Sequence, residues 1–405
     1  MKILVLNSGS SSLKFQLFAL DSLATQNLQL LASGLVEKIA EAQGAIQLDY
    51  LNAQQQLEHF SQASVIANHQ QALEVMTQLL KSKHCLESMQ DLAGIGHRVV
   101  HGGEHFTQAT LIDAQVIDTI DKLSPLAPLH NPANLTGIAL AQQKAPKVPQ
   151  VAVFDTSFHQ TLAKSAYIYA LPYALYEKHQ VRRYGFHGTS HHYVAKQASA
   201  YLTQRNAQDA KLITVHLGNG ASICAILNGQ SIDTSMGMTP LEGLVMGTRC
   251  GDIDPAILLY LNRETGMSFA ELDTLVNKKS GLKGVCGTND MRSIIERAEQ
   301  GDPQAELAIH IFAYRIKKYM GAYFAALNGL DAVIFTGGIG EHSSVIRALV
   351  CQDLDALGIQ VDTEKNNSTS KESLEIQSEH SAVKVLVIPT NEELEIAEQT
   401  LAVIS

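Results

Sequence analysis

Short apolar runs that end in turns of small residues set the pattern of this chain. Residues 3–6 form an apolar run, residues 7–12 are small and polar, and Leu13, Phe15 and Leu17 then alternate with polar side chains. A period of two predicts two strands joined by a small turn. Gly and Ser let backbone N–H groups and hydroxyls approach an anion closely, so this turn indicates either an oxyanion site or an ordinary solvated hairpin.

The same layout recurs later in the chain. Residues 212–229 form an apolar strand, a turn that contains Gly218, Asn219 and Gly220, and a second apolar strand. Residues 332–343 are a third apolar run, which ends in a turn rich in Gly. About 200 residues separate the first two copies, which predicts two related halves of a duplicated fold. Three such turns favour one nucleotide held by backbone groups from several directions.

Apolar residues at helical spacing predict the main helices. They lie at residues 64–80, 268–277 and 302–327, and a further helix begins at Asp290. The polar residues 362–381 are predicted to form a solvated excursion.

The C-terminal segment predicts a last strand at residues 383–388 and a helix that Asn391 caps. Glu392 and Glu393 lie in the first turn of this helix. Their charges either complement the helix dipole or face a metal ion.

Composition narrows the class of protein. The 405 residues, 45% of them hydrophobic and 17% charged, predict a soluble enzyme of two domains, with a boundary near residue 150, where the composition shifts. The net charge of -10 argues against nucleic acid or an anionic membrane as the main partner. No membrane span or signal peptide is evident, and five dispersed cysteines indicate free thiols in a reducing cytoplasm.

A basic cluster follows the apolar residues 92–96. His97, His101 and His105 recur every four residues, but two intervening glycines would break a helix that aligned them, so a zinc site is disfavoured. Arg98 lies among apolar residues and is either tied to a structural carboxylate or reserved for an anionic ligand.

Three later segments carry further candidate chemistry. Asp155 follows the apolar residues 150–154, and a carboxylate there either belongs to a sheet-edge site or caps the next helix. Residues 182–192 contain two Arg and three His around two Gly, which favours an anion-binding loop whose Thr or Ser caps the following helix. Residues 235–255 form a long loop that carries Arg249, and such loops are usually functional.

Common nucleotide-binding motifs are missing from the sequence. It contains no GxxxxGK[ST] P-loop, no GxGxxG that opens a helix after a strand, no protein-kinase motif set and no GxSxG elbow. The predicted phosphate-binding turns lie between the strands of hairpins instead.

Nine segments together resemble one known family, that of the acetate kinases, in order and spacing from residue 1 to the last helix. They are LNSGSSSLKF, GHRVVHGGE, PLHNPANL, VFDTSFHQ, YGFHGTSH, HLGNGAS, DTSMGMTPLEGLVMGTRCGDIDP, FTGGIGE and PTNEE. The resemblance implies the α/β fold of acetate and sugar kinases, Hsp70 and actin, which is ribonuclease H-like. In this fold a duplicated mixed-sheet core is flanked by helices, and a nucleotide lies in the cleft between two domains. We place these domains at residues 1–150, completed by a C-terminal helix at about 391–405, and at residues 151–390.

The resemblance also implies a homodimer and the reversible reaction of ATP with acetate to give ADP and acetyl phosphate. The implied cofactor is Mg²⁺, with Mn²⁺ as an alternative, at Asn7 and Glu392. The catalytic positions would be Arg98, Asp155, His187 and Arg249. The acetate pocket would be formed by Arg98, Val100, Leu129, Phe186 and Pro240. The ATP contacts would be Lys14, His216, Leu217, Gly218, Asn219, Gly220, Asp290, Met291, Arg292, Gly338, Ile339, Gly340, Glu341 and His342.

The chain departs from the family at His342, where Asn is usual. Acetate is already ionised at neutral pH, so Asp155 is expected to position groups or the metal ion instead of abstracting a proton. The main alternative within the family is a propionate kinase, with butyrate kinase less favoured. The alternative from another class is an actin-like or Hsp70-like ATPase without a small-acid substrate.

Overall fold

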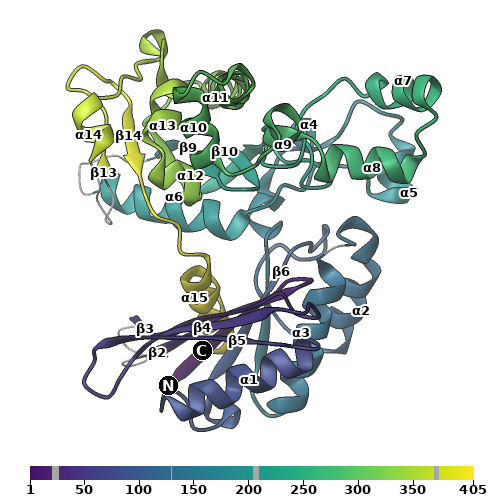
Figure 1. The fold of residues 1–405 in the computed structure, drawn as a ribbon, viewed down its shortest axis with the longest axis vertical. Helices are drawn as coiled ribbons and strands as arrows, with labels where there is room; N and C mark the ends of the chain where they lie inside the picture. The colour runs from purple at the N-terminus through teal and green to yellow at the C-terminus, as the bar shows by residue number, and fades with distance from the viewer. Residues whose placement is uncertain (21–26, 129, 204–208, 369–373) are drawn as a thin grey trace. The chain divides into compact units, whose positions relative to one another are not determined.

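The computed structural model describes all residues except 21–26, 129, 204–208 and 369–373. The chain divides into two compact units (Figure 1). The first unit contains Met1–Phe158 and Asn391–Ser405, and the second contains His159–Thr390. Leu129, predicted for the acetate pocket, lies outside the described residues.

An eight-stranded sheet forms the centre of the first unit. Its order is β5-β4-β3-β2-β1-β6-β8-β7, with β6 parallel to both β1 and β8. The alternation at Leu13, Phe15 and Leu17 buries these side chains on one face of β2, so the predicted hairpin is confirmed. The strands are β1 (Lys2–Ser8), β2 (Ser12–Leu20), β3 (Leu28–Glu37), β4 (Gly44–Leu51), β5 (Leu57–Ser64), β6 (Gly94–Val99), β7 (Thr110–Leu111) and β8 (Gln150–Phe154).

Helices cover the first sheet. Leu73 and Met76 of α1 and Ala141 of α3 share one core cluster with β1 and β2 residues, whereas Ile396 and Leu401 of α15 belong to a separate cluster. The helices of this unit are α1 (His69–Ser82), α2 (Ala114–Lys122), α3 (Asn131–Lys144) and α15 (Glu392–Ile404), and two short 3-10 helices are η1 (Met89–Asp91) and η2 (Ser124–Leu126).

A six-stranded sheet forms the centre of the second unit. Its order is β11-β10-β9-β12-β14-β13, and β12 is parallel to both β9 and β14. The long helix α11 packs against β10, and α6 packs against β9 and β12. The strands are β9 (Lys211–Leu217), β10 (Ala221–Leu227), β11 (Gln230–Thr234), β12 (Ala332–Thr336), β13 (Leu374–Glu375) and β14 (Lys384–Val387).

Most helices of the chain belong to the second unit. Ser268 caps α8, Asp290 caps α10 and Asp302 caps α11, so these three predicted helix starts are confirmed to within a residue. The helix predicted at residues 64–80 begins only at His69, because Ser64 ends β5. The helices are α4 (Lys164–Tyr167), α5 (Ala174–His179), α6 (Gly188–Thr203), α7 (Ala256–Thr265), α8 (Phe269–Lys278), α9 (Gly281–Cys286), α10 (Met291–Glu299), α11 (Pro303–Leu327), α12 (Gly337–His342), α13 (Ser344–Cys351) and α14 (Thr363–Asn367), with the 3-10 helices η3 (Ser157–Thr161), which begins in the first unit, and η4 (Asp355–Leu357).

The two sheets contain the same five-stranded arrangement. The order β3-β2-β1-β6-β8 in the first matches β11-β10-β9-β12-β14 in the second, with two antiparallel and two parallel pairings in each. The predicted duplication is therefore present at the level of topology. The third Gly-rich segment is not a hairpin turn as predicted, because Gly337–His342 forms the short helix α12 directly after β12.

Two further sequence-based expectations need correction. β8 pairs in parallel with β6, so it belongs to the first sheet, and the first unit extends to Phe158 instead of residue 150. The polar segment 362–381 is not simply solvated, because Asn366, Ile376 and Gln377 within it are buried. Of the described helices, none is both long enough and apolar enough to span a bilayer.

Candidate active site

An arginine and an aspartate face each other at the carboxyl ends of two adjacent parallel strands. Arg98 lies in β6, and Asp155 directly follows β8. Arg98 Nε lies 3.0 Å from Asp155 Oδ1, and Arg98 Nη2 lies 2.7 Å from Oδ2. Asp155 is fully buried and Arg98 keeps about a fifth of its side chain exposed. Asp155 therefore holds the guanidinium from one side and does not serve as a helix cap.

The first turn of α15 brings two more carboxylates to this edge of the sheet. Glu392 Oε2 lies 4.0 Å from Arg98 Nε, and Glu393 Oε1 lies 2.6 Å from Lys14 Nζ. Lys14 in β2 is paired with Asn7 in β1. Residues predicted for catalysis, ATP contact and metal binding thus lie on neighbouring elements of one unit. Glu393 was missed as the partner of Lys14, and its only sequence signal was its place beside Glu392.

Nearby carboxylates keep the Arg98 guanidinium protonated. Burial alone would lower the pKa of the Arg98 guanidinium, but Asp155 and Glu392 raise it above its ordinary value. Burial raises the pKa of Asp155, and Arg98 opposes that rise through charge and two hydrogen bonds. A bidentate contact of this length is the geometry of an ion pair, so both groups are charged at neutral pH.

Buried amides fix the chain just after Arg98. Val100 N donates to Asn134 Oδ1 at 3.1 Å, and Asn134 Nδ2 donates to Ser8 O at 2.8 Å. Asn134 of α3 thereby ties the buried Val100, predicted for the acetate pocket, to the end of β1. His97 lies within 2.8 Å of the Gln150 side chain and has a structural partner there.

In the second unit, two segments converge on the turn between β9 and β10. Gly218 N donates to Gly220 O at 2.9 Å, which closes the turn. A Cβ atom on Gly220 would lie 2.8 Å from Arg249 Nη2 and 3.3 Å from His187 Nε2. The turn, His187 and Arg249 therefore surround one small space that only a glycine leaves open.

A hydrogen-bonded set of histidines orients His187. Ser222 Oγ lies 2.8 Å from His187 Nδ1 and 2.7 Å from His191 Nε2, and the rings of His187 and His216 stack with centroids 4.4 Å apart. Burial, followed by the neighbouring His159 and His216, lowers the pKa of His191 well below its usual range. His191 is therefore neutral and acts as a structural anchor.

Ser190, one of the two residues predicted to cap α6, has another role. Ser190 lies inside the first turn of α6, and its Oγ is 2.7 Å from His216 Nδ1 and 2.8 Å from Thr390 Oγ1. The prediction that Thr189 or Ser190 caps this helix is wrong, because α6 begins at Gly188 and both residues lie inside its first turn.

Arg249 lies on the long loop predicted to be functional. Residues 235–255 form no helix or strand, and Arg249 Nη1 donates to Pro240 O. Burial lowers the pKa of the Arg249 guanidinium, and within the described residues no carboxylate forms an ion pair with it. A partly buried arginine without a protein counter-charge is suited to an anionic ligand.

Two anchors hold the Arg249 loop. Arg183 lies 2.6 Å from Glu242 Oε1 and donates to Thr234 O at 2.8 Å. Asp252 accepts from Gly243 N and from the Tyr319 hydroxyl, each at 2.8 Å. These contacts fix both ends of the loop around Arg249.

The two arginines at 182 and 183 were predicted to belong to an anion-binding loop, and the structure assigns them other contacts. Arg183 anchors the Arg249 loop, and the Arg182 guanidinium stacks 3.7 Å above the Tyr167 ring. Of the segment 182–192, His187 is the side chain that reaches the Gly220 turn.

A cavity of about 530 Å³ adjoins the same turn. Backbone from the turn and from α12 lines it, together with apolar side chains from α10 and α12. A pocket with a Gly-rich wall and apolar sides suits a nucleotide. The predicted ATP contacts that line it are Gly218, Asn219, Asp290, Met291, Arg292, Gly338, Ile339 and His342.

Other predicted ATP contacts are found beside this cavity but not among its lining residues. His216 and Leu217 end β9, and Gly220 faces His187 and Arg249. Gly340 is buried in α12, and Glu341 Oε1 accepts from Gly337 N at 2.9 Å and from Thr390 N at 3.1 Å. Glu341 therefore has a structural role in holding the start of α12.

Comparisons with known proteins agree over the whole chain. The sequence profile described as the Acetokinase family matches residues 2–398. The acetate kinase of Campylobacter lari is 51% identical over 404 residues, which cover 100% of this chain and 99% of that protein. The acetate kinase of Syntrophobacter fumaroxidans is 49% identical over 405 residues, covering 100% and 97%.

Solved structures agree with these matches. The crystal structure of Porphyromonas gingivalis acetate kinase superimposes with a TM-score of 0.91 at 42% identity, and each chain is covered to 100%. That of a propionate kinase from Francisella tularensis gives a TM-score of 0.90 at 45% identity, and each chain is covered to 99%.

Proposed function

Because this chain belongs to the acetokinase family, we propose that it transfers the γ-phosphoryl group of ATP reversibly and directly to acetate, giving acetyl phosphate and ADP. The observation that carries this proposal is the convergence of Arg249 and His187 on the Gly220 turn. This arrangement brings the guanidinium of Arg249 and the imidazole of His187 next to the backbone of Gly220, which has no side chain to block a ligand. The family match favours this kinase over an actin-like or Hsp70-like ATPase.

The reaction brings two anions together, so the enzyme has to offset their repulsion and hold the reacting atoms in line. Arg249 supplies a positive charge that no carboxylate of the described residues neutralises. We assign it, with His187, to the transferring phosphoryl group. An arginine in that role accelerates phosphoryl transfer by roughly 10³–10⁵ in related chemistry.

Arg98 is the group that we assign to the carboxylate of acetate. Its Nε and Nη2 atoms bind Asp155, and its Nη1 atom is assigned to the substrate. Asp155 then orients Arg98. It need not act as a base, because acetate reaches the enzyme already ionised. Val100, Leu129, Phe186 and Pro240 are assigned to the acetate methyl group.

We assign the metal ion to Asn7 and Glu392. Mg²⁺ takes oxygen ligands and is commonly held by one or two carboxylates together with substrate phosphates. The amide of Asn7 and the carboxylate of Glu392 fit this chemistry, and Mn²⁺ would accept the same donors. Among the described residues, no group of three or more His, Cys, Asp or Glu side chains is placed to hold a metal ion. When bound, the ion would supply positive charge to the ATP phosphates.

The cavity beside the Gly220 turn is assigned to the nucleotide, with Lys14 as a further ATP contact. The apolar residues Met291, Ile295 and Ile339 line it and would contact the base. His342 lines the same cavity where the family usually has Asn, so its imidazole would take the place of an amide.

We further infer that the enzyme is a cytoplasmic homodimer. Exposed apolar side chains at Ile257, Leu259 and Tyr260 give α7 a face that a second copy could cover. Light scattering after size exclusion would give twice the mass of the 43.9 kDa chain, whereas a monomer mass would contradict the assignment.

An acyl hydroxamate assay tests the proposed activity. Purified enzyme with ATP and Mg²⁺ should form hydroxamate rapidly from acetate, more slowly from propionate and least from butyrate. Arg249→Ala should lower kcat by at least about 10³-fold. Lys81→Ala is the control, because the exposed cationic side chain of Lys81 lies in the last turn of α1, outside both the assigned site and α7, and this variant should leave kcat unchanged. ATP hydrolysis without any acyl phosphate would contradict the proposal.

Propionate is the second candidate substrate, favoured by the likeness to the Francisella tularensis propionate kinase. The two acids differ by one methylene, which a pocket discriminates by only about 1–3 kcal/mol. Some propionate turnover is therefore expected. A higher kcat/KM for propionate than for acetate would identify the chain as a propionate kinase.

A further inference from the structure

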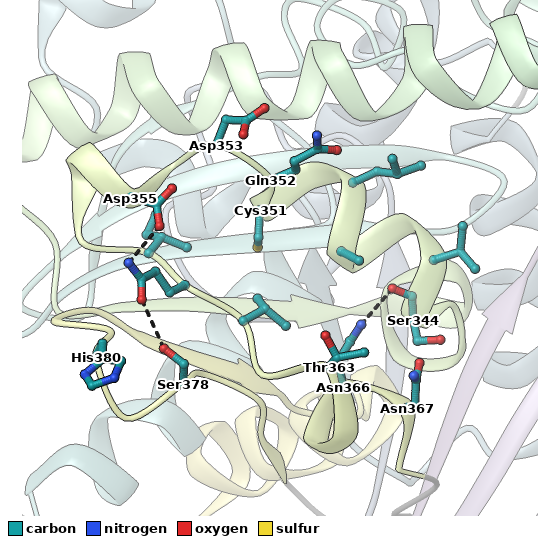
Figure 2. A pocket seen from close by; sticks show the side chains of 16 residues that line it. Ser344, Cys351, Gln352, Asp353, Asp355, Thr363, Asn366, Asn367, Ser378 and His380 are labelled. Atoms are coloured by element: carbon teal, nitrogen blue, oxygen red, sulfur yellow. Dashed lines mark hydrogen bonds between the residues drawn. The ribbon is translucent and has the colours of Figure 1, made fainter.

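A second and larger cavity lies elsewhere in the second unit. Its volume is about 800 Å³, it is open to solvent on one side, and it lies between α13, α14 and residues that follow each of these helices (Figure 2). Figure 2 shows Asp353, Asp355 and His380 at one end and Ser344 and Asn366 toward the other. None of the roles assigned above uses this space.

The lining of this cavity carries two acidic side chains. All of its lining residues are described, and none of them is Lys or Arg. Asp353 and Asp355 place carboxylates at one end, while Val345, Leu349 and Ile359 form an aliphatic wall. The two carboxylates, both on exposed residues, disfavour phosphates and carboxylates at that end. A small cation with an aliphatic body matches both parts of the lining.

Hydrogen bonds hold one of these carboxylates in place. Gln360 Nε2 donates to Asp355 Oδ1 at 2.7 Å, and Ser378 Oγ donates to Gln360 Oε1 at 3.2 Å (Figure 2). This chain joins η4 to the segment before β14 and orients Asp355 before any ligand arrives. A preoriented acceptor lowers the ordering cost of binding.

The cavity shares a wall with the proposed nucleotide cavity. Ser344 and Val345, in the first turn of α13, line both spaces. A ligand on one side of this turn therefore touches residues that a nucleotide would touch on the other side.

A buried arginine connects the same two regions. Arg347 of α13 is almost fully buried, and its Nη1 atom donates to Gly340 O and Glu341 O of α12, each at 2.9 Å. Its Nε and Nη2 atoms donate to Asn366 Oδ1 and Asn366 O of α14 at 2.8 and 2.7 Å. Asn366 Nδ2 in turn donates to Ser344 O at 2.8 Å. The helix at the nucleotide cavity and the helix at the second cavity are thus bound to one guanidinium.

We propose that the second cavity binds a small protonated aliphatic amine. We further propose that the bound amine changes the affinity of the enzyme for nucleotide through α13 and Arg347. The coupling rests on the proposed function, whereas the amine site does not. Linkage requires that the nucleotide change amine affinity by the same factor as the amine changes nucleotide affinity.

Calorimetric titration of the full-length enzyme without nucleotide tests the site. The probe is 3-methylbutylamine at pH 7, and 3-methylbutan-1-ol is the uncharged control with the same carbon skeleton. The amine should bind at least about fivefold more tightly than the alcohol. Asp353→Asn and Asp355→Asn should each weaken amine binding by up to about fivefold. Asp121→Asn, the same change on α2 of the other unit, should leave it unchanged.

Two results of this titration would overturn the site. One is equal affinity for amine and alcohol. The other is amine binding that persists at full strength in both aspartate variants.

The coupling is tested by measuring the Kd of ADP with and without saturating amine, and the Kd of the amine with and without ADP. Both ratios should differ from one by the same factor, at least about fivefold. Arg347→Lys should bring both ratios close to one, and Asn366→Ala, which keeps the backbone acceptor of Arg347, is the second variant if the first does not fold. An ADP affinity that the amine leaves unchanged would overturn the coupling. Failure of ADP to bind at all would instead contradict the proposed function and leave the amine result standing.

Discussion

Arg98 and Asp155 form a bidentate ion pair across two adjacent parallel strands, with donor–acceptor distances of 3.0 and 2.7 Å. Asp155 is buried at the end of β8, so its carboxylate is fixed by the sheet, and Arg98 is fixed by Asp155. The carboxyl end of parallel strands is where open α/β sheets bind their ligands. The pair therefore gives Arg98 a rigid orientation at the expected place.

Removing the charge of Asp155 should lower kcat strongly while the size of the side chain stays the same. Asp155→Asn keeps the size of the side chain but replaces one acceptor with a donor, so Arg98 loses a bidentate partner. We expect kcat in the hydroxamate assay to fall by at least about 10²-fold, because misplacement of a positioning group by about 1 Å has an effect of this size. The free energy of unfolding should fall by about 3 kcal/mol, since one partner of a buried pair is lost.

The exposed pair of Asp118 and Lys122 provides the control, because its nitrogen and oxygen are 2.6 Å apart but both side chains face solvent. Asp118→Asn should leave kcat unchanged. Near wild-type turnover of Asp155→Asn at saturating ATP and Mg²⁺ would mean that the charge of Asp155 is not needed.

A methyl group on Gly220 should block the point where Arg249 and His187 meet. The added Cβ would lie 2.8 Å from Arg249 Nη2 and 3.3 Å from His187 Nε2, so one or both side chains would have to move. We expect Gly220→Ala to lower kcat by about 10²-fold or more, with a smaller change in the midpoint of thermal unfolding.

Gly321→Ala is the matched control, since Gly321 lies inside α11 and a Cβ there meets nothing within 4 Å. This variant should keep full activity and gain about 0.5–1 kcal/mol of stability. If the two alanine variants had the same kcat, the space at Gly220 would have no catalytic role.

Shortening the side chain of Val100 should change the preference of the enzyme for propionate relative to acetate. Val100 is buried directly after β6, and its backbone is held by Asn134. Val100→Ala removes two methyl groups from the assigned pocket wall and leaves the backbone bond to Asn134 in place. The ratio of kcat/KM for propionate to that for acetate should rise by about tenfold, which corresponds to one methylene. An unchanged ratio would remove Val100 from the pocket.

Hairpins and helix starts could be predicted from the sequence, because each depends on residues that are close together along the chain. The β1–β2 hairpin follows from the alternation at Leu13, Phe15 and Leu17, and the caps at Ser268 and Asp302 each lie next to the helix that they start. Such patterns depend on a few neighbouring residues.

Pairings between distant residues could not be predicted in this way. The sequence alone does not decide whether Arg98 binds a structural carboxylate or an anionic ligand. Its partner Asp155 lies 57 residues away, so no local pattern identifies it. Arg183 lies in a segment predicted to be an anion-binding loop, but it forms an ion pair with Glu242 and donates to the carbonyl of Thr234, partners that only folding of the chain brings near. The polar segment 362–381 reads as solvated, yet Asn366 is buried because Arg347 binds it.

The buried histidine His97 should make the first unit sensitive to acid. Burial lowers the pKa of His97 from 6.5 to about 4, although its hydrogen bond to Gln150 partly opposes this. Between these two values the unfolded chain binds a proton at this position that the folded chain does not. The free energy of unfolding therefore rises with pH in this window. The contribution of His97 to it is lost as the pH falls from about 6.5 to 4, with a slope of up to about 1.4 kcal/mol per pH unit.

Urea unfolding at pH 5.0, 5.5, 6.0 and 7.0, followed by circular dichroism, measures this slope. His97→Asn removes the titrating ring but keeps an amide that can bond to Gln150, so the slope between pH 5 and 6 should fall by up to about 1.4 kcal/mol per unit. His159, whose pKa burial also lowers to about 4, remains in the second unit and keeps part of the acid sensitivity. His84→Asn is the control, because His84 is largely exposed, and its slope should match the wild type. Equal slopes for His97→Asn and the wild type would show that His97 titrates normally in the folded protein.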